Sequence, residues 1–259
     1  MKRRFALLLA AAVLLCSCAK KAPAAETDAP ETVTSVPRAT ASLQEREKTR
    51  MSVFRETVEN LAYESRLPDG STVPQGTDSA SMDGNFFALA DVNGDGEQEL
   101  ILNFLTGPAA SMSGFLCGYD ETAGSLTIEL QAFPAFRFYP GGLVEAQLSH
   151  NQGLAGDALW PYTLYRYVSG AFAESASVDA WDKTMGLTDY TGTPFPEETD
   201  ADGDGIVYLV TREGRTEAMD GEAYAQWRRA TLGTEVSTPV TYYSITRDNI
   251  RQAFADTEG

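Results

Sequence analysis

Cysteine and histidine are scarce in this chain of 259 residues, which has three cysteines and one histidine. Zinc sites need three or four ligands drawn mainly from these residue types, so the composition gives no basis for zinc. Cys117 lies in an apolar stretch and is expected to be a buried small hydrophobe rather than a nucleophile. The fold must therefore depend on its hydrophobic core.

Sequence motifs of the common catalytic classes are also absent. The chain has no Gly-x-Ser-x-Gly elbow, His-Glu-x-x-His helix, phosphate-binding Gly-x-x-x-x-Gly-Lys-Ser/Thr loop or Gly-x-Gly-x-x-Gly turn. Ser149 precedes His150, but adjacent residues of a strand point to opposite faces, so we expect no nucleophile and base pair there and interpret His150 as a loop or turn histidine. A pair of carboxyl groups of the glycosidase kind stays open, because 37 acidic residues allow many pairs. No catalytic residue is assigned.

No apolar run reaches the roughly 20 residues that a membrane-spanning helix needs. The N-terminus instead has a basic Lys2–Arg4 followed by eleven apolar residues, Phe5–Leu15, as in a secretory signal. The next residues complete the tetrad Leu-Cys-Ser-Cys, which resembles the bacterial lipobox. That resemblance implies cleavage before Cys18 and a lipid on its sulfur, and hence a membrane-anchored lipoprotein of the cell envelope. Cys16 would leave with the signal, so no internal disulfide could form.

Basic residues are few, with 20 Lys and Arg against 37 Asp and Glu. Cleavage before Cys18 removes three basic residues and no acidic residue, so the formal net charge changes from −17 to −20. Such a chain is repelled by nucleic acid and by anionic lipid headgroups, so we expect neither as a partner. Solubility is the commoner use of an acidic surface.

Three segments follow from composition. Residues 1–17 are the predicted signal peptide. Residues 18–42 carry the acylated cysteine and a tether rich in Ala, Pro, Thr and Glu without an apolar period, which we expect to be disordered. Residues 43–259 are long enough for one domain with its own core.

The domain is predicted to be α+β, with an N-terminal helix, an antiparallel β meander and two short C-terminal helices packed beside it. The first helix is expected from Leu43 to Arg66, with Phe54, Val58 and Leu61 on its buried face. Asp220 can cap the second, which ends before Gly233, and the third begins near Arg247. The expected strands are Phe86–Ala90, Leu100–Leu105, Phe115–Tyr119, Leu126–Leu130, Phe136–Tyr139, Leu143–Leu148, Tyr162–Val168, Ala171–Glu174 and Ile206–Val210.

An acidic loop stands between the first two strands, with the sequence Asp-Val-Asn-Gly-Asp-Gly-Glu-Gln-Glu over residues 91–99. Oxygen-bearing side chains recur at positions 1, 3, 5 and 9, and a glycine at position 6 allows a sharp turn. Three carboxylates this close repel one another, and a cation would relieve the repulsion. The alternative is a hairpin turn without an ion, which Asn-Gly and Asp-Gly favour unaided.

The loop is not an EF-hand, because position 12 is Leu102 and the flanks read as strands. It resembles the loops of FG-GAP/VCBS-type repeats and of secreted bacterial lipoproteins with one such hairpin. The resemblance covers about sixteen residues and implies a calcium ion. Its implied ligands are the side chains of Asp91, Asn93, Asp95 and Glu99 and the carbonyl of Glu97.

A second acidic loop precedes the strand that begins at Ile206. Asp200, Asp202 and Asp204 match positions 1, 3 and 5 of the first loop, but position 9 is Tyr208, which supplies no carboxylate. A second metal ion here and a solvated acidic turn both remain open.

Aromatic residues are concentrated within about thirty residues, and two uses of them are open: a platform for a glycan or a protein partner, or core packing. We expect a non-catalytic binding or surface-interaction module with structural calcium. The alternative is an envelope hydrolase acting on glycan or peptide through unidentified carboxylates. The aromatic residues are Trp160, Tyr162, Tyr165, Tyr167, Trp181 and Tyr190.

Overall fold

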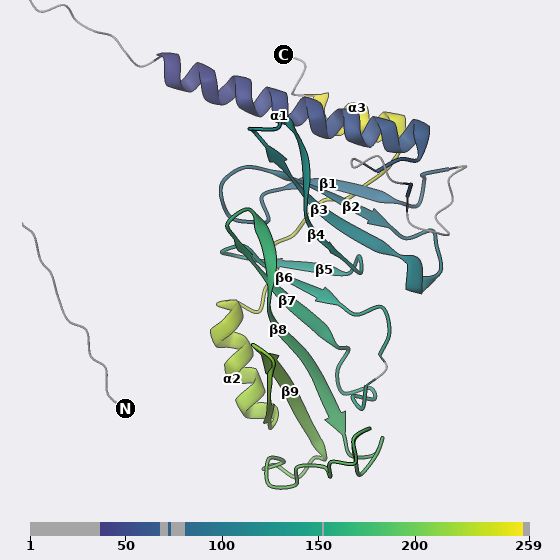
Figure 1. Cartoon of the computed structure of the whole chain (residues 1–259), viewed down its shortest axis with the longest axis vertical. Coiled ribbons are helices and arrows are strands. Elements are labelled where there is room, and N and C mark those ends of the chain that lie inside the picture. The colour runs from purple at the N-terminus through teal and green to yellow at the C-terminus, as the bar shows by residue number, and fades with distance from the viewer. Residues whose placement is uncertain (1–36, 68–71, 74–80, 152, 256–259) are drawn as a thin grey trace, which may run out of the picture.

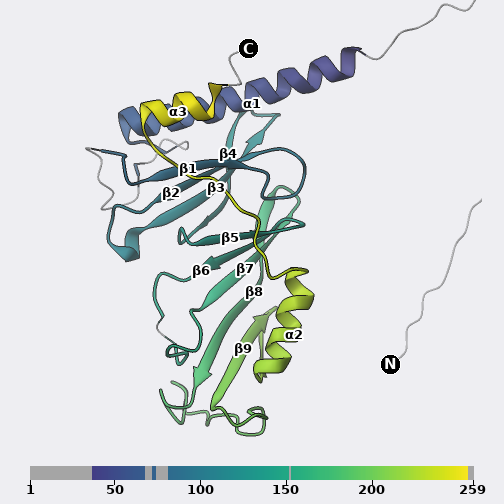
Figure 2. The same cartoon turned by 180° about the vertical axis from the view of Figure 1, so that it is seen from behind.

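Two antiparallel sheets and three α-helices make up the fold in the computed structural model, which describes residues 37–67, 72–73, 81–151 and 153–255, with side chains from residue 43 onward (Figures 1 and 2). The predicted α+β class is confirmed. The helices are α1 (Pro37–Glu64), α2 (Gly221–Leu232) and α3 (Arg247–Ala253), with a 3-10 turn η1 (Ala109–Ser111). The strands are β1 (Phe86–Ala90), β2 (Glu99–Phe104), β3 (Ser113–Asp120), β4 (Ser125–Ala132), β5 (Phe136–Tyr139), β6 (Leu143–Gln147), β7 (Tyr162–Val168), β8 (Ala171–Asp182), β9 (Ile206–Arg212), β10 (Arg215–Met219) and β11 (Tyr243–Ser244).

The predicted meander is divided into two sheets. The first has the order β11-β1-β2-β3-β4 and the second the order β10-β9-β8-β7-β6-β5, so each sheet is built from strands that follow one another along the chain. Only β11 joins out of sequence, when the chain returns after α2 and pairs with β1. Short connections between antiparallel neighbours account for this order.

Alternating side chains place the first sheet between two hydrophobic layers. All six residues of β2 are buried. Leu100 and Leu102 pack with residues of α1 and α3, whereas Ile101, between them, packs with residues of the second sheet. In β6, Val144 belongs to this layer between the sheets, and Leu143 packs with α2 on the far face. The layers are therefore α1 with α3, the first sheet, the second sheet, and α2.

Helix α1 begins at Pro37, six residues before the expected start. Proline fits the first helical position, where its missing N–H has no helical partner and its φ is already suitable. The predicted tether, residues 18–42, therefore overlaps the first six residues of α1. Phe54, Val58 and Leu61 are fully buried, as the spacing predicts.

The C-terminal helices carry the expected signals. The Asp220 side chain accepts a hydrogen bond from the N–H of Ala223, and Gly233 ends α2 in the left-handed conformation with φ 69°. Inside the fold, Arg228 of α2 donates to Glu145 of β6 at 2.7 Å and to the Tyr162 hydroxyl at 2.6 Å. Glu145 is only 1% exposed, so this ion pair fastens α2 to the second sheet.

The largest departures from the predicted strands lie in the second sheet. β8 continues to Asp182, eight residues past the expected end, and β10 was not predicted. The sequence of β10, Arg-Thr-Glu-Ala-Met, has an exposed and polar first half, so it gives no alternating apolar signal. β10 is a strand because it pairs with β9, although its own composition does not favour a strand.

Part of the N-terminal prediction cannot be compared with the structure. The signal peptide, Cys18 and the tether up to residue 36 lie outside the described residues, as does most of the polar stretch 69–84. Within the described part of the chain, none of the helices combines the length and the apolar character that crossing a membrane requires.

Candidate metal-binding loops

Side-chain oxygens of the first acidic loop hold its backbone in place. The Asp91 carboxylate accepts hydrogen bonds from the N–H groups of Gly94 at 2.7 Å and Gly96 at 3.0 Å. The Asn93 side-chain oxygen accepts from the N–H of Asp95 at 2.9 Å, and both glycines have positive φ. Short polar side chains that bond to the backbone two to five residues ahead explain why this sequence forms a tight loop.

Glu99, the last residue of this loop, is buried, with 3% exposure. Its carboxylate accepts from the N–H groups of Val92 at 2.8 Å and Asn93 at 3.2 Å, and from the Asn93 side-chain amide at 3.0 Å. Burial nevertheless raises the pKa of Glu99 to about 8, and the neighbouring carboxylates of Glu129 and Asp95 add to the rise. The site therefore favours either a proton or a compensating cation at Glu99.

Glu129 of β4 is a fifth acidic side chain at this loop, in addition to the four within residues 91–99, and the sequence pattern did not predict it. Burial and the charge of Asp95 raise the pKa of Glu129 to about 7. The Tyr167 hydroxyl donates to one of its carboxyl oxygens at 3.3 Å, and the other oxygen is buried with no hydrogen-bond partner among the described residues. Thirty residues separate Glu129 from Glu99, so no local pattern indicates that they meet.

The first loop also lies where several elements join. Glu97 directs its carboxylate to Arg50 of α1, which also pairs with Glu47. On the other side, a Cβ added to Gly142, in the turn between β5 and β6, would lie 2.4 Å from the carbonyl oxygen of Asn93. The loop thus contacts α1 and the second sheet, and its conformation is coupled to the packing of both.

The second acidic loop brings its three carboxylates together. Asp200, Asp202 and Asp204 each place one oxygen within 4.8 Å of the others, so this group could hold a metal ion. The N–H groups of Gly205 and Ile206 donate to Asp200 at 3.1 Å and to Asp204 at 2.7 Å. The second carboxyl oxygen of Asp200 is buried and has no partner among the described residues, a deficit that a bound cation would remove.

The two loops differ in how their ligands are arranged. Among the described residues, the close acidic group occurs in the second loop, and Asp91, Asp95 and Glu99 do not form one of equal tightness. In the first loop the Asn93 amide nitrogen donates to both Asp95 and Glu99 at 3.0 Å. Rotating that amide by half a turn would present oxygen instead of nitrogen to a cation, but it would break the hydrogen bond that the Asn93 oxygen accepts from the N–H of Asp95.

The predicted loop position of His150 is confirmed, but the predicted orientation of Ser149 and His150 is wrong. Their side chains do not point apart: the Ser149 hydroxyl lies 2.8 Å from the Nδ1 atom of His150. The physical reason is that β6 ends at Gln147, so strand alternation no longer applies. The contact lies at the surface, where water competes for both groups, and we assign it no role.

Of the two uses left open for the six aromatic residues, the structure favours core packing over one exposed platform. Tyr162 and Trp181 are 3% and 4% exposed and belong to different buried clusters, whereas Trp160 and Tyr190 are exposed. Tyr165 and Tyr167 pack between the two sheets. Core packing thus accounts for most of these rings.

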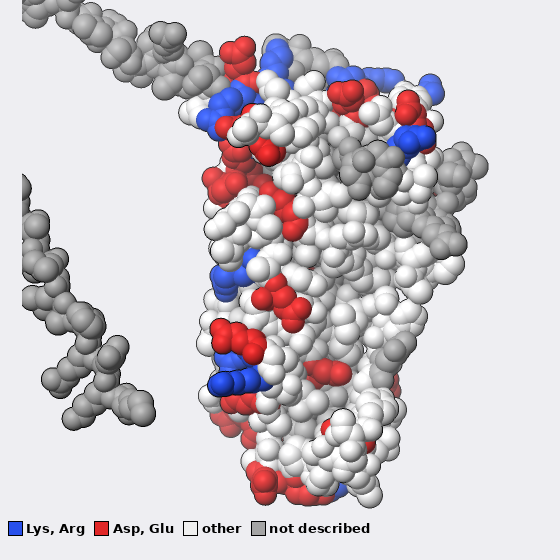
Figure 3. Space-filling model, in the orientation of Figure 1, with Lys and Arg blue, Asp and Glu red and all other residues white. Residues whose placement is uncertain are grey.

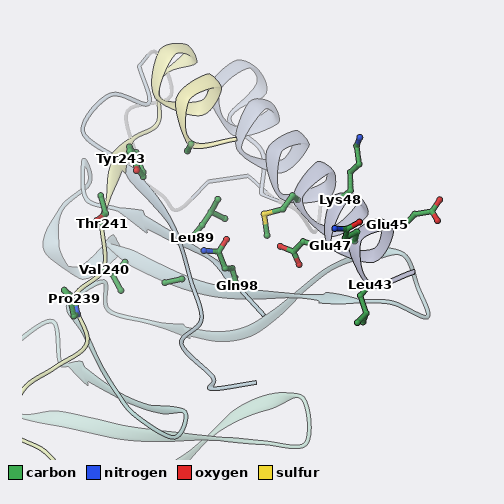
Figure 4. A pocket seen from close by; sticks show the side chains of 14 residues that line it. Leu43, Glu45, Glu47, Lys48, Leu89, Gln98, Pro239, Val240, Thr241 and Tyr243 are labelled. Carbon is green, nitrogen blue, oxygen red and sulfur yellow. The ribbon is translucent and has the colours of Figure 1, made fainter. Parts of the chain in front are cut away.

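A cavity of about 1310 Å³ lies beside the first loop, between α1 and residues 239–243. In Figure 4, Glu47 and Gln98 point toward each other, and Leu89 lies beside Gln98. Lys48 and Glu45 point away from the cavity. Its lining mixes apolar side chains with acidic and amide groups, so it offers no single ligand chemistry.

Comparison with known proteins gives little guidance. No protein-family model and no curated protein matches the chain. A solved structure described as "Structure of a Xanthomonas Type IV Secretion System related protein" is similar over 51% of this chain and 57% of that chain, with 13% identity and a TM-score of 0.30. The chain thus spans little more than half of that protein, and a likeness at this TM-score carries no argument about function.

Proposed function

We propose that this protein is a lipoprotein of the bacterial cell envelope, anchored through Cys18, whose domain is a non-catalytic binding module stabilised by calcium. The basic residues, short apolar run and lipobox-like tetrad at the N-terminus support the anchor. Two observations together carry the metal proposal: Asp200, Asp202 and Asp204 each place an oxygen within 4.8 Å of the others, and one Asp200 carboxyl oxygen is buried with no hydrogen-bond partner among the described residues.

Charge repulsion supports a second calcium ion in the first loop. The carboxylates of Glu129 and Asp95 add to the burial that raises the pKa of Glu99, and Asp95 likewise adds to the rise at Glu129, so the loop holds more negative charge than its surroundings stabilise. Asp91, Asn93, Asp95 and Glu99 would supply side-chain oxygens, and Glu97 a backbone carbonyl. The Glu97 side chain pairs with α1, which leaves its carbonyl as the group available to an ion.

Calcium suits these loops better than magnesium. Calcium accepts six to eight oxygen ligands in flexible geometry, whereas magnesium demands a strict octahedron and retains several waters. Both loops offer several protein oxygens within a few residues of one another. In this role the ion is structural: it neutralises the loop and fixes the strands that flank it.

The test is a thermal melt of the mature chain, made with Cys18→Ser so that it is soluble, first in chelator and then in millimolar calcium. At ten times the dissociation constant each site adds about 1.4 kcal/mol, or roughly 3–5 °C for a domain of this size. Asp202→Asn and Asp95→Asn should each lose part of the rise. Asp157→Asn, an exposed acid outside both loops, should keep it.

The anchor needs a separate test, because calcium binding does not depend on it. The full chain with Cys18 should be recovered with membranes and gain the mass of a lipid on its mature N-terminus. Cys18→Ser should appear in the soluble fraction without that mass. A wild-type chain found soluble and unmodified would rule out the lipoprotein assignment.

A further inference from the structure

The far end of the second sheet is an ordered loop that displays apolar side chains to solvent. Residues 183–205 connect β8 to β9 at the lower end of the molecule in Figure 1. The Trp181 ring packs edge-on against Phe195 with centroids 5.4 Å apart, and its indole N–H donates to the carbonyl of Gly186 at 2.8 Å. These contacts fasten the loop to the sheet at two points.

Within this loop, residues 187–195 form a small hairpin. The N–H of Phe195 donates to Leu187 at 3.0 Å, and the N–H of Asp189 donates to Thr193 at 2.8 Å. The Asp189 carboxylate accepts from the hydroxyl and N–H of Thr191 and from the N–H of Thr193, and these hydrogen bonds lower its pKa. The hairpin tip is therefore held in one conformation, which reduces the entropy that binding would cost.

Three large apolar or aromatic side chains project from this ordered frame. Met185 is 54% exposed, Leu187 67% and Tyr190 81%. Single exposed apolar residues are ordinary on a protein surface, but here three fall within six residues, two of them in the hairpin and Met185 just before it, and so concentrate apolar surface at this end of the molecule. Trp and Tyr residues on rigid frames are also the commonest energetic centres of protein interfaces.

The surroundings of this patch are acidic. Residues 183–205 contain six carboxylates and one lysine, and that residue, Lys183, is paired with Glu197. Figure 3 shows acidic side chains gathered at the same end of the molecule. A calcium ion at Asp200–Asp204 would leave the segment net negative. The complementary partner is therefore cationic.

We propose that this end of the molecule, with Met185, Leu187 and Tyr190 at its centre, is the docking surface for a basic protein segment that carries apolar side chains. The apolar centre supplies the burial, and the acidic rim steers and orients the basic partner. This inference rests on the proposed role as a binding module and adds the surface and the chemistry of its partner.

The experiment uses the mature Cys18→Ser chain and labelled peptides of about twelve residues, a length chosen to cover a patch of this size. One peptide alternates Lys and Leu, a second Lys and Ser, and a third Glu and Leu. Binding is followed by fluorescence anisotropy at about 0.15 M salt, where non-specific attraction is partly screened. The tip variant is Leu187→Ser with Tyr190→Ser. The matched control is Val168→Ser with Val236→Ser, two apolar residues of comparable exposure outside this loop.

The Lys-Leu peptide should bind the parent chain and the control alike, and the tip variant at least tenfold more weakly. The Lys-Ser peptide should bind weakly and the Glu-Leu peptide not at all. Equal binding by the tip variant and the control would overturn the inference, as would failure of the Lys-Leu peptide to bind. Stronger, tip-dependent capture of vesicles with anionic lipid would overturn it in favour of a membrane surface.

These results are separable from those that test the proposed function. Calcium binding is read from the melting temperature, and anchoring from the lipid mass at Cys18. If both hold and no peptide binds, the docking inference alone is wrong. If the peptide binds at the tip and calcium causes no shift, the metal proposal alone is wrong.

Discussion

Replacing Glu99 by glutamine should make the calcium-free protein more stable at neutral pH. In chelator, the folded-state pKa of Glu99 is about 8, against an ordinary value of 4.5 in the unfolded chain. Because the pKa is raised on folding, its stabilising contribution is complete below pH 4.5 and is lost as the pH rises toward 8. At pH 7 this loss is about 3 kcal/mol.

Glutamine has no charge to desolvate, so Glu99→Gln avoids this loss. Its oxygen can still accept from the N–H groups of Val92 and Asn93, but its amide would face the Asn93 amide, at a cost of about 1 kcal/mol. The variant should therefore be about 2 kcal/mol more stable than the wild type at pH 7 in chelator, or roughly 4–8 °C higher in melting temperature. At pH 5 the two proteins should melt within about 2 °C of each other.

Calcium should reverse this order, because the wild-type carboxylate can ligate the ion and the glutamine carries no charge to attract it. The assay is a set of melts at pH 5, 6, 7 and 8, with chelator and with calcium, and Glu198→Gln serves as an exposed control. A Glu99→Gln chain that is less stable than the wild type at pH 7 in chelator would refute the reasoning. So would a variant whose melting temperature depends on pH as steeply as that of the wild type.

Three further substitutions probe the frame around the loops. Glu145→Ala removes the buried partner of Arg228 and should lower the free energy of unfolding by about 3–5 kcal/mol in denaturant melts, whereas loss of an exposed pair would change it by less than about 1 kcal/mol. Gly142→Ala places a Cβ against the Asn93 carbonyl at positive φ, so it should lower both the melting temperature and the calcium response; an unchanged response would show that the turn does not support the loop. Asp220→Ala removes the α2 cap and should cost about 0.5–2 kcal/mol by the same melts, with Asp220→Asn close to the wild type.

Local signals in the sequence predicted many of these elements. The bounds of β1, β5 and β7 match the predicted runs, because apolar and β-branched residues there are delimited by turn residues. Asp220 and Gly233 mark the ends of α2 because capping acts over one helical turn. The backbone turns of the two acidic loops were also predictable from local sequence, because their hydrogen bonds join residues close in sequence.

Features set by contacts between distant residues could not be predicted in this way. The chain divides into two sheets because β4 and β5 do not pair with each other. The alternation of apolar and polar residues along one strand does not specify which neighbour that strand pairs with. Glu129 reaches the first loop from another strand, and Arg50 reaches it from α1. The exposed hairpin at residues 187–195 is ordered by Trp181, whose role depends on the packing of Phe195 across the loop.

The most direct test of the central claim is equilibrium dialysis of the chelator-stripped mature chain against calcium, with the bound ion counted per chain. The account predicts saturable binding in the range of about 10⁻⁴–10⁻³ M that is typical of extracellular calcium sites, with one ion for each acidic loop. Asp202→Asn should lose one of these ions and Asp95→Asn the other, while magnesium competes weakly. A chain that retains no calcium at millimolar concentration would contradict the account and would leave both loops as turns held by their own hydrogen bonds.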